Sequence, residues 1–443
     1  MAISQLPEIQ SLHDHRSLVR IPPEEDIPLT PRVKRLIDTA PFRRLSRISQ
    51  LGLVSLVYPA AHHTRFEHSL GTYRLALLSL DQLSSDPRFQ QLVDTRDAGI
   101  FLAAALLHDI GHWPFCHPIE DLQLPGVPRH ELLAEHFLST PEMALILQED
   151  WQTTPAEILA ILNNFPGKAS VPVLNSLLSG PIDVDKMDYL PRDSLHAGVP
   201  YGRHFDRQRL LGSICVNRQG DGIAIGEKGR TAAEMMVFSR YVMFSEVYWH
   251  HAVRSATAML QRAFFRLHTT IDLPELFRQD ESQMVDHLRR LASSTGFEDL
   301  VEGLFGPRRV LYKRLSQFSL LKDPDFYSRL ARQPYEWLVR LSDQIAERIG
   351  QHLGCTVRAD EVLIDTPPAK LEVEFDVSIH YPDEDCYRML GDVSPVVHAL
   401  AHTQFDDYVK RVRIFLHPRL AGGTDELPIE TFLEEAMDHI GQP

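Results

Sequence analysis

The densest group of chemically reactive side chains lies in the segment LLHDIGHWPFCHPIED, residues 106–121. His108 and Asp109 stand side by side at the end of an apolar run, and further histidines follow closely. A neutral imidazole and a carboxylate suit a divalent metal that keeps open positions for water and for a phosphate oxygen. Neighbouring residues on a helix point about 100° apart, so other segments must complete the ligand shell. The segment therefore predicts a metal centre assembled from distant parts of the chain.

Two other segments offer the missing ligands: HHTRFEHSLG, residues 62–71, and DVDKMDYLPRD, residues 183–193. On its own, each is more typical of a solvated charged surface than of a site. In the second segment four residues stand at helical spacing: Asp185, Asp188, Tyr189 and Arg192. One helix face would then present carboxylate, phenol and guanidinium groups together, with Lys186 at its edge. A carboxylate can bind a metal while Lys and Arg hold phosphate oxygens.

Helices are expected to position these residues. Residues 97–107, DAGIFLAAALL, are apolar on all sides, which predicts a buried helix that Asp97 caps and that Gly111 and Pro114 bring to an end. The pattern over residues 240–267 predicts a second long core helix. Pro191 is expected to kink or end the helix of the third segment near Tyr189.

The C-terminal third has a different pattern. Apolar residues alternate with polar ones from Leu371 to Ile379, which predicts a half-buried strand. A second alternation, Val412, Ile414 and Leu416, predicts a neighbouring strand of a small sheet. We therefore expect a mainly α protein with a helical domain over residues 1–270 and a smaller C-terminal α+β region, containing a short antiparallel sheet, over residues 271–443.

Composition excludes several classes of protein. The 443 residues are 44% apolar and 24% charged, as in globular proteins. A formal net charge of −15 argues against broad binding to nucleic acid or anionic membranes, so a polyanionic ligand needs a local basic pocket. There is neither a signal peptide nor an apolar run of about 18 residues, so a cytoplasmic location is expected. The four cysteines form no C-x-x-C pair and predict neither disulfides nor a cysteine zinc site.

Three ordered motifs resemble the deoxynucleoside triphosphate (dNTP) triphosphohydrolase branch of the HD superfamily. They are H-x-x-R-F-E-H-S-L-G, H-D-x-G-H-x-P-F-x-H and D-V-D-K-x-D-Y. The upstream segment RRLSRISQLG, residues 43–52, is also similar to that family. The resemblance covers roughly residues 36–205 and becomes thin after residue 270. It implies a helical HD-domain core.

Carried over by motif, the resemblance implies three groups of site residues. The metal ligands would be His68, His108, Asp109 and Asp185. The residues near the scissile phosphate would be His112, His117 and His130, the last followed by Glu131, with His112 as a proton donor or transition-state stabiliser. Phosphates would be held by Arg65, Lys186 and Arg192. The sugar and base would be contacted by Gln50, Tyr189, Asp193, Tyr248 and His250 or His251.

The chain departs from the family pattern in three places. The usual D-P-I-H-G opening is replaced by SLVRIPPEEDIPL, residues 17–29, which puts an allosteric nucleotide site there in doubt. Trp113 stands where a small residue is common, and we expect it to narrow the pocket. Pro191 interrupts the third motif.

The expected reaction follows from metal chemistry and from the resemblance. A divalent ion, Mg, Mn or Fe, would promote hydrolysis of a phosphoester or anhydride. The resemblance implies attack at the α-phosphorus of a dNTP, releasing deoxynucleoside and triphosphate, in a homo-oligomer (dimer or tetramer) that a nucleotide can activate. One alternative is another HD phosphohydrolase, a nucleotidase or phosphodiesterase, which would share the metal ligands. A second is a non-catalytic nucleotide-binding regulator, for which a proton donor would serve no purpose.

Overall fold

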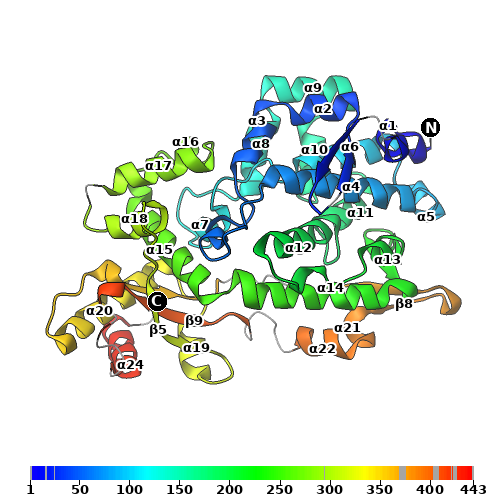
Figure 1. The fold of residues 1–443 in the computed structure, drawn as a ribbon. Helices are drawn as coiled ribbons and strands as arrows, with labels where there is room; N and C mark the ends of the chain where they lie inside the picture. The colour runs from blue at the N-terminus through cyan, green and yellow to red at the C-terminus, as the bar shows by residue number, and fades with distance from the viewer. Residues whose placement is uncertain are drawn as a thin grey trace.

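The computed structural model describes residues 2–14, 17–23, 25–293, 295–368, 376–402, 409–420, 422 and 427–441. Most of these residues are helical, and small sheets lie beside the helices (Figure 1). The predicted fold class is confirmed: mainly α, with a short antiparallel sheet in the C-terminal region. Among the described helices, none has both the length and the apolar character needed to cross a bilayer.

The helices of the first 200 residues are α1 (Pro7–Gln10), α2 (Pro31–Ile37), α3 (Ala40–Arg44), α4 (Arg65–Leu83), α5 (Pro87–Leu92), α6 (Thr95–Leu107), α7 (Cys116–Glu120), α8 (His130–Leu138), α9 (Pro141–Trp151), α10 (Pro155–Leu162), α11 (Ser170–Ser179) and α12 (Val184–Ala197). The later helices are α13 (Arg207–Leu211), α14 (Arg230–Met243), α15 (His251–Leu267), α16 (Leu273–Leu276), α17 (Glu281–Ala292), α18 (Glu298–Phe305), α19 (Pro324–Leu330), α20 (Tyr335–Leu353), α21 (Leu390–Val393), α22 (Pro395–His402) and α24 (Ile429–Ile440).

The described strands form three sheets. An N-terminal hairpin pairs β1 (Leu18–Ile21) with β2 (Glu25–Pro28). A second sheet has the order β3 (Ile214–Val216), β4 (Ile223–Gly226), β7 (Ser378–Tyr381), β8 (Cys386–Met389), and its β4 and β7 are parallel. The third is antiparallel, with the order β5 (Lys313–Phe318), β9 (Val412–Leu416), β6 (Val362–Asp365).

The two predicted C-terminal strands belong to different sheets, so the prediction that they are neighbours was wrong. Residues 371–375 of the first lie outside the described residues, and its end forms β7, which pairs with β4 and β8. The second forms β9, the central strand of the other sheet. All five residues of β9 are buried, Arg413 included, and strands flank it on both edges. Alternation along one strand does not specify its partners.

The long helical pattern over residues 240–267 is divided into two helices, so the prediction of one helix was wrong. Helix α14 ends at Met243, a π-helical turn covers Phe244–Tyr248, and α15 starts at His251. The side chain of His250 accepts a hydrogen bond from the Ala252 backbone and so caps α15. The break places Tyr248 and Trp249 between the two helices. In one continuous helix, the directions of these two side chains would instead follow the regular helical repeat.

Helix α12 continues past Pro191 to Ala197, so the expected end near Tyr189 was also wrong. Asp188 and Arg192 lie one turn apart on either side of the proline. Their side chains form a buried two-point ion pair with contacts of 2.6 and 2.9 Å. This pair ties the two halves of the helix together where Pro191 contributes no backbone donor.

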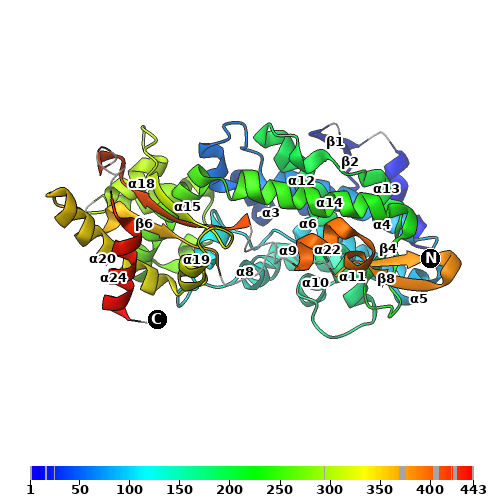
Figure 2. The same ribbon diagram turned by 90° about the horizontal axis from the view of Figure 1, so that it is seen from below.

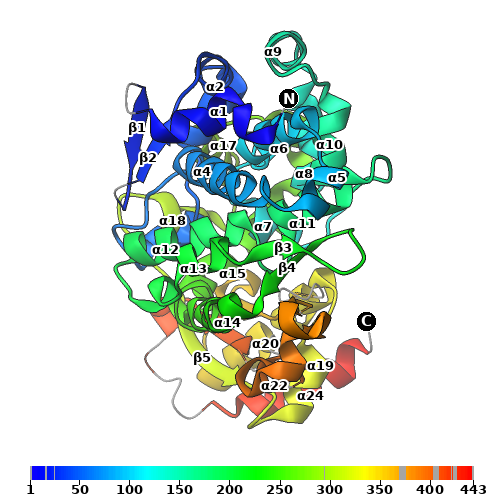
Figure 3. The same ribbon diagram turned by 90° about the vertical axis from the view of Figure 1, so that its right-hand side faces the viewer.

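Helix α6 is buried from Asp97 to Leu107, as predicted, but it starts two residues before Asp97. Asp94 is its N-cap, and the Asp94 side chain accepts a hydrogen bond from the Asp97 backbone. The Asp97 carboxylate instead binds Lys168 and Ser170. Helix α4 packs against both α6 and α12, so the three helices that carry the first, second and third motifs are neighbours (Figure 3).

Apolar packing connects the two ends of the molecule. The sheet of β5, β9 and β6 lies with α20 and α24 at one end, and α4, α11 and α12 lie at the other (Figure 2). Helix α15 contacts this sheet and also α7, next to the second motif. From the C-terminal third, Ile379 and Val397 join the core of the first half. The division of the chain near residue 270 stays a prediction.

Helices α4 and α12 come so close together that there is no room for a side chain at Gly71. A Cβ atom there would lie 1.9 Å from Asp188 Oδ1 and 2.4 Å from Arg192 Nη2. In α6, a Cβ atom at Gly99 would meet nothing within 4 Å.

We expect Gly71→Ala to lower the free energy of unfolding by about 1–3 kcal/mol, the usual cost of overpacking. Gly99→Ala is the matched control, and it should be neutral or stabilising by up to about 1 kcal/mol because alanine favours the helix. Chemical denaturation measures both. Equal stability of the two variants would contradict the close approach of α4 and α12.

Candidate metal centre

Three helix ends converge on one point. His68 lies in the first turn of α4, His108 follows the last residue of α6, and Asp185 lies in the first turn of α12. Asp109, next to His108, completes the four residues predicted as metal ligands. The structure therefore brings together residues that are 117 positions apart in the chain, counted from His68 to Asp185.

The donor atoms of these residues lie close to one another. His68 Nε2 is 2.9 Å from Asp185 Oδ1 and 3.2 Å from His108 Nε2. His108 Nε2 is 3.7 Å from Asp185 Oδ1 and 3.6 Å from Asp109 Oδ1. His68, His108 and Asp185 alone make a group that could hold a metal ion, and Asp109 borders it. Two imidazole nitrogens and a carboxylate oxygen that face one point can share a proton or bind a cation, and this donor set fits a divalent metal.

The second nitrogen of each imidazole is bound, which fixes the ring. His68 Nδ1 is 2.8 Å from Asp188 Oδ2. His108 Nδ1 is 2.9 Å from the carbonyl oxygen of Ala105, which can only accept, so Nδ1 carries the proton. Both Nε2 atoms are thereby left with a lone pair directed at the common point.

Charges around the centre favour ionised carboxylates. Burial opposes a charge on His68, but its contacts with Asp185 and Asp188 outweigh burial and raise the pKa of His68 to about 10. Burial likewise opposes ionisation of Asp109, but His112 and Arg65 hold the pKa of Asp109 well below its ordinary value. Arg65 Nη1 donates to Asp109 Oδ2 at 2.8 Å. A cation bound to His68 Nε2 would replace a proton that these carboxylates otherwise hold there.

The centre opens into a cavity of about 860 Å³. The predicted site residues that line it, besides the four metal ligands, are Gln50, Arg65, His112, His117, His130, Glu131, Tyr189, Asp193 and Tyr248. Trp113 does not line the cavity, so the expectation that it narrows the pocket was wrong. Its ring is buried and stacks on Phe277 at 4.3 Å, inside the core.

Four predicted substrate residues lie elsewhere. Lys186 Nζ donates to the Gly180 carbonyl at 3.0 Å and to Asp183 at 2.6 Å. Arg192 is buried and, besides Asp188, binds Glu67 and the Pro22 carbonyl of the N-terminal hairpin. His250 caps α15, and neither it nor His251 lines the cavity. Ion pairs inside the protein thus occupy two of the three cations predicted to bind phosphate, Lys186 and Arg192.

A group of three imidazoles lies beside the metal centre. The rings of His112 and His130 are 3.8 Å apart, and that of His117 is 5.3 and 5.4 Å from them. Burial and the Arg65 guanidinium lower the pKa of His112 well below its ordinary value. Glu120 accepts hydrogen bonds from the His130 backbone at 2.6 Å and from His130 Nδ1 at 3.0 Å. Glu131 Oε1 is 3.6 Å from His130 Nε2.

Asp193 also lines the cavity and is held by two residues. His63 Nε2 is 2.8 Å from Asp193 Oδ1, and the Tyr248 hydroxyl donates to Asp193 Oδ2 at 2.6 Å. The His63 ring stacks on His196, with ring centres 4.4 Å apart. Gln50 Oε1 is buried and makes no hydrogen bond with the described residues, so a ligand donor can satisfy it.

Sequence reasoning assigned no role to three residues that support the site. Asp188 orients His68, and Glu120 orients His130. Two signals were visible in the sequence: the helical spacing of Asp188 from Asp185, and the position of Glu120 after the second motif. Neither signal specifies the residue that Asp188 or Glu120 contacts. Arg240 lines the cavity, and its place within a long helical pattern carried no signal.

The contact between Asp188 and His68 predicts an effect on metal affinity. Asp188→Asn keeps the size and one acceptor but removes the charge, so the affinity for Mn²⁺ should fall about 10–100-fold, as for other residues that orient metal ligands. Isothermal titration with Mn²⁺ measures this, on protein whose fold is checked by circular dichroism.

Glu67→Gln is the matched control, because Glu67 also binds Arg192 but does not touch His68. Glu67→Gln should bind Mn²⁺ with nearly the affinity of the original protein. Equal losses in the two variants would mean that Asp188 acts only through Arg192.

Comparison with known proteins agrees with this geometry. Residues 65–190 match the family model of the HD domain, and residues 205–416 match that of the HD associated region. Uncharacterized protein MJ1154 of Methanocaldococcus jannaschii is 31% identical over 388 residues, which is 85% of this chain and 74% of that protein.

Two further matches extend the comparison. The human deoxynucleoside triphosphate triphosphohydrolase SAMHD1 is 27% identical over 303 residues, which is 61% of this chain, and the match spans about half (48%) of the human protein. The crystal structure of a hypothetical protein from Aquifex aeolicus has a TM-score of 0.69 at 25% identity, covering 96% of this chain and 100% of that one. The chain belongs to the HD superfamily of phosphohydrolases.

Proposed function

We propose that the protein hydrolyses dNTPs to deoxynucleoside and inorganic triphosphate, with a divalent metal bound by His68, His108, Asp109 and Asp185. One observation carries the proposal: a single cavity joins these four residues to a group of imidazoles, to a buried arginine and to Asp193. Such a cavity can hold a phosphate chain beside the metal ligands and a nucleoside beside Asp193. The SAMHD1 relative, named as a dNTP triphosphohydrolase, supports the choice of substrate.

The metal and Arg65 would act on the phosphate. When bound, a divalent ion neutralises charge that develops on a phosphate and makes a water molecule more acidic. Arg65 is 5% exposed and donates to Asp109 through one nitrogen, while its Nε makes no hydrogen bond with the described residues. A buried guanidinium can hold a phosphate oxygen in place and neutralise its charge without losing much side-chain freedom.

The three imidazoles would handle the proton of the leaving oxygen. Cleavage at the α-phosphorus releases the 5′ oxygen of the deoxynucleoside, and that oxygen takes up a proton. His112 contacts the metal ligand Asp109 at 3.0 Å, and His130 lies against His112. His117 has 62% of its side chain exposed, so it can exchange protons with solvent. We assign proton transfer to this group, with His130 oriented by Glu120.

Asp193 and Gln50 would bind the nucleoside. His63 and Tyr248 hold Asp193 from two sides, so its carboxylate has a defined direction at the cavity wall. A carboxylate there can accept a hydrogen bond from a sugar hydroxyl, and Gln50 Oε1 can accept another. Polar groups fixed before the ligand binds select it at little entropic cost.

Labelled water tests the reaction itself. We expect incubation with each dNTP, singly and mixed, in Mg²⁺ or Mn²⁺ and H₂¹⁸O, to give deoxynucleoside and triphosphate, with ¹⁸O in the triphosphate. Asp109→Ala and a chelator should each abolish turnover. Activity only in the mixture would add activation by a nucleotide.

Other products would overturn this proposal. Release of pyrophosphate and deoxynucleoside monophosphate, or of orthophosphate, would indicate another HD phosphohydrolase. A lack of turnover of every dNTP, with metal bound, would favour a different phosphoester or a binding role.

The two glutamates near His130 should differ in effect. Glu120→Gln should lower kcat about 10–100-fold with metal content unchanged, because Glu120 holds His130 through one hydrogen bond to its backbone and one to its ring Nδ1. Glu131→Gln should have the smaller effect, because Glu131 lies at 3.6 Å. Steady-state kinetics with metal analysis compares them. A larger loss in Glu131→Gln would assign the orienting role to Glu131 instead.

A further inference from the structure

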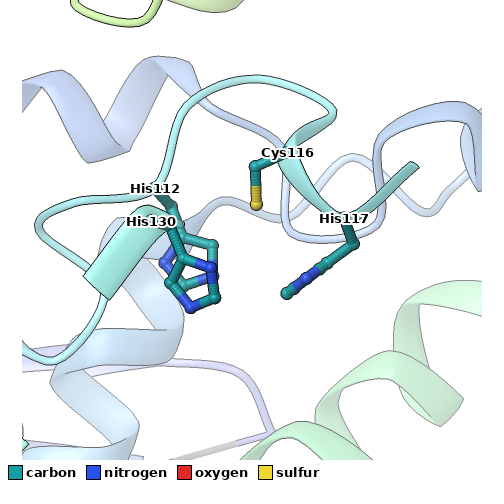
Figure 4. Close-up of side chains that lie close together, drawn as sticks. All are labelled: His112, Cys116, His117 and His130. Carbon is teal, nitrogen blue, oxygen red and sulfur yellow. The ribbon is translucent and has the colours of Figure 1, made fainter. Parts of the chain in front are cut away.

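A second group of donor atoms lies beside the metal centre. His112, Cys116, His117 and His130 each offer one ligand atom, and these four atoms all lie within 4.8 Å of one another. They come from the turn after α6 and from the first residues of α7 and α8. Figure 4 shows the Cys116 sulfur and the ring of His117 directed toward the space beside His112 and His130.

The donor types select the kind of cation. In a tetrahedral zinc site the bonds are about 2.0–2.3 Å, which places the ligand atoms about 3.3–3.8 Å apart. Side-chain rotations that bring the four ligand atoms about 1 Å closer to one another would therefore be enough to form a zinc site. Three imidazoles and a thiolate are a soft ligand set, which favours Zn²⁺ and Co²⁺ over Mg²⁺. The set contains no carboxylate, unlike the centre at Asp109 and Asp185.

Two further observations fit a cation at this point. His130 is backed by a carboxylate, since Glu120 binds its Nδ1, and this arrangement is typical of metal-binding histidines. His112 Nδ1 is buried and makes no hydrogen bond with the described residues, and Asp109 Oδ1 lies 3.0 Å from it. A buried polar atom without a hydrogen bond is costly unless a ligand satisfies it.

We propose that His112, Cys116, His117 and His130 form a second cation site that takes Zn²⁺ and similar ions and is distinct from the centre at His68. Binding displaces the proton of the Cys116 thiol to solvent as the metal–sulfur bond forms. The ion also takes up lone pairs of the imidazoles assigned to proton transfer, so its binding inhibits hydrolysis. Only this inhibition rests on the proposed function; the binding does not.

Titration of the full-length protein with Co²⁺ tests the binding. A thiolate bound to Co²⁺ gives a charge-transfer absorption in the near ultraviolet, which imidazole and carboxylate ligands do not. We expect this band in the original protein and its loss in Cys116→Ser, while the visible absorption of Co²⁺ bound at the other centre remains.

Cys355→Ser is the matched control, because Cys355 is the exposed thiol that would bind cobalt adventitiously. It should keep the band. A band that persists in Cys116→Ser, that disappears only in Cys355→Ser, or that is absent from the original protein would overturn the site.

A second variant covers the case in which Cys116→Ser does not fold. The side chain of His117 is largely exposed, so His117→Gln removes one ligand with little effect on the core. Its affinity for Zn²⁺, measured by competition with a chromophoric chelator, should fall at least about 10-fold. An unchanged affinity would overturn the four-ligand site.

Inhibition is measured separately. Zn²⁺ should inhibit dNTP hydrolysis by the original protein, and Cys116→Ser should need at least about 10-fold more Zn²⁺ for the same inhibition. Equal sensitivity would overturn the inhibition. If no dNTP is hydrolysed, the proposed function fails, and the cobalt titration still decides whether the site exists.

Discussion

The buried carboxylate of Asp188 joins the elements on which the site depends. One oxygen lies 2.8 Å from His68 Nδ1, and both oxygens accept from Arg192. His68 belongs to α4 and Asp188 to α12, so the same interaction that orients a metal ligand also fixes two helices against each other. Breaking a buried charge pair by removing one partner typically costs about 3–5 kcal/mol. The site and the fold are therefore stabilised by the same contacts.

This network of ion pairs also explains why the basic residues near the site differ in their availability to a phosphate ligand. Arg192 is occupied by Asp188, Glu67 and the N-terminal hairpin, and Lys186 by the cap of its own helix. Arg65 alone of the three predicted phosphate-binding cations lines the cavity. With a net charge of −15, the chain presents this positive charge locally, in the lining of a cavity, where phosphate would meet it.

The residues that meet at the candidate metal centre could be singled out from the sequence because their signals are local. A histidine and an aspartate after an apolar helix, and an aspartate at the start of another helix, are recognisable from residue types and spacing. The partners of these residues were not predictable, because Asp188 and Glu120 act through contacts between segments distant in sequence. The same holds for the group of His112, Cys116, His117 and His130. A C-x-x-C pair is a local signal, whereas these four residues come from three separate segments.

The errors in secondary structure have physical causes as well. A proline inside α12 was expected to kink or end the helix, but the helix continues to Ala197, and the ion pair between Asp188 and Arg192 spans the proline within it. Apolar residues recur at helical spacing over residues 240–267, so the pattern gave no sign of the π-helical turn at Phe244–Tyr248. Strand pairing failed for a different reason, since alternation identifies a strand but not its neighbours.

The location of bound Mn²⁺, determined from anomalous diffraction by crystals of the protein grown with that ion, tests the central claim most directly. The account predicts a peak at bonding distance, about 2.0–2.2 Å, from the donor atoms of His68, His108, Asp109 and Asp185. A peak at another position, or full occupancy of Mn²⁺ without contact to these residues, would contradict it.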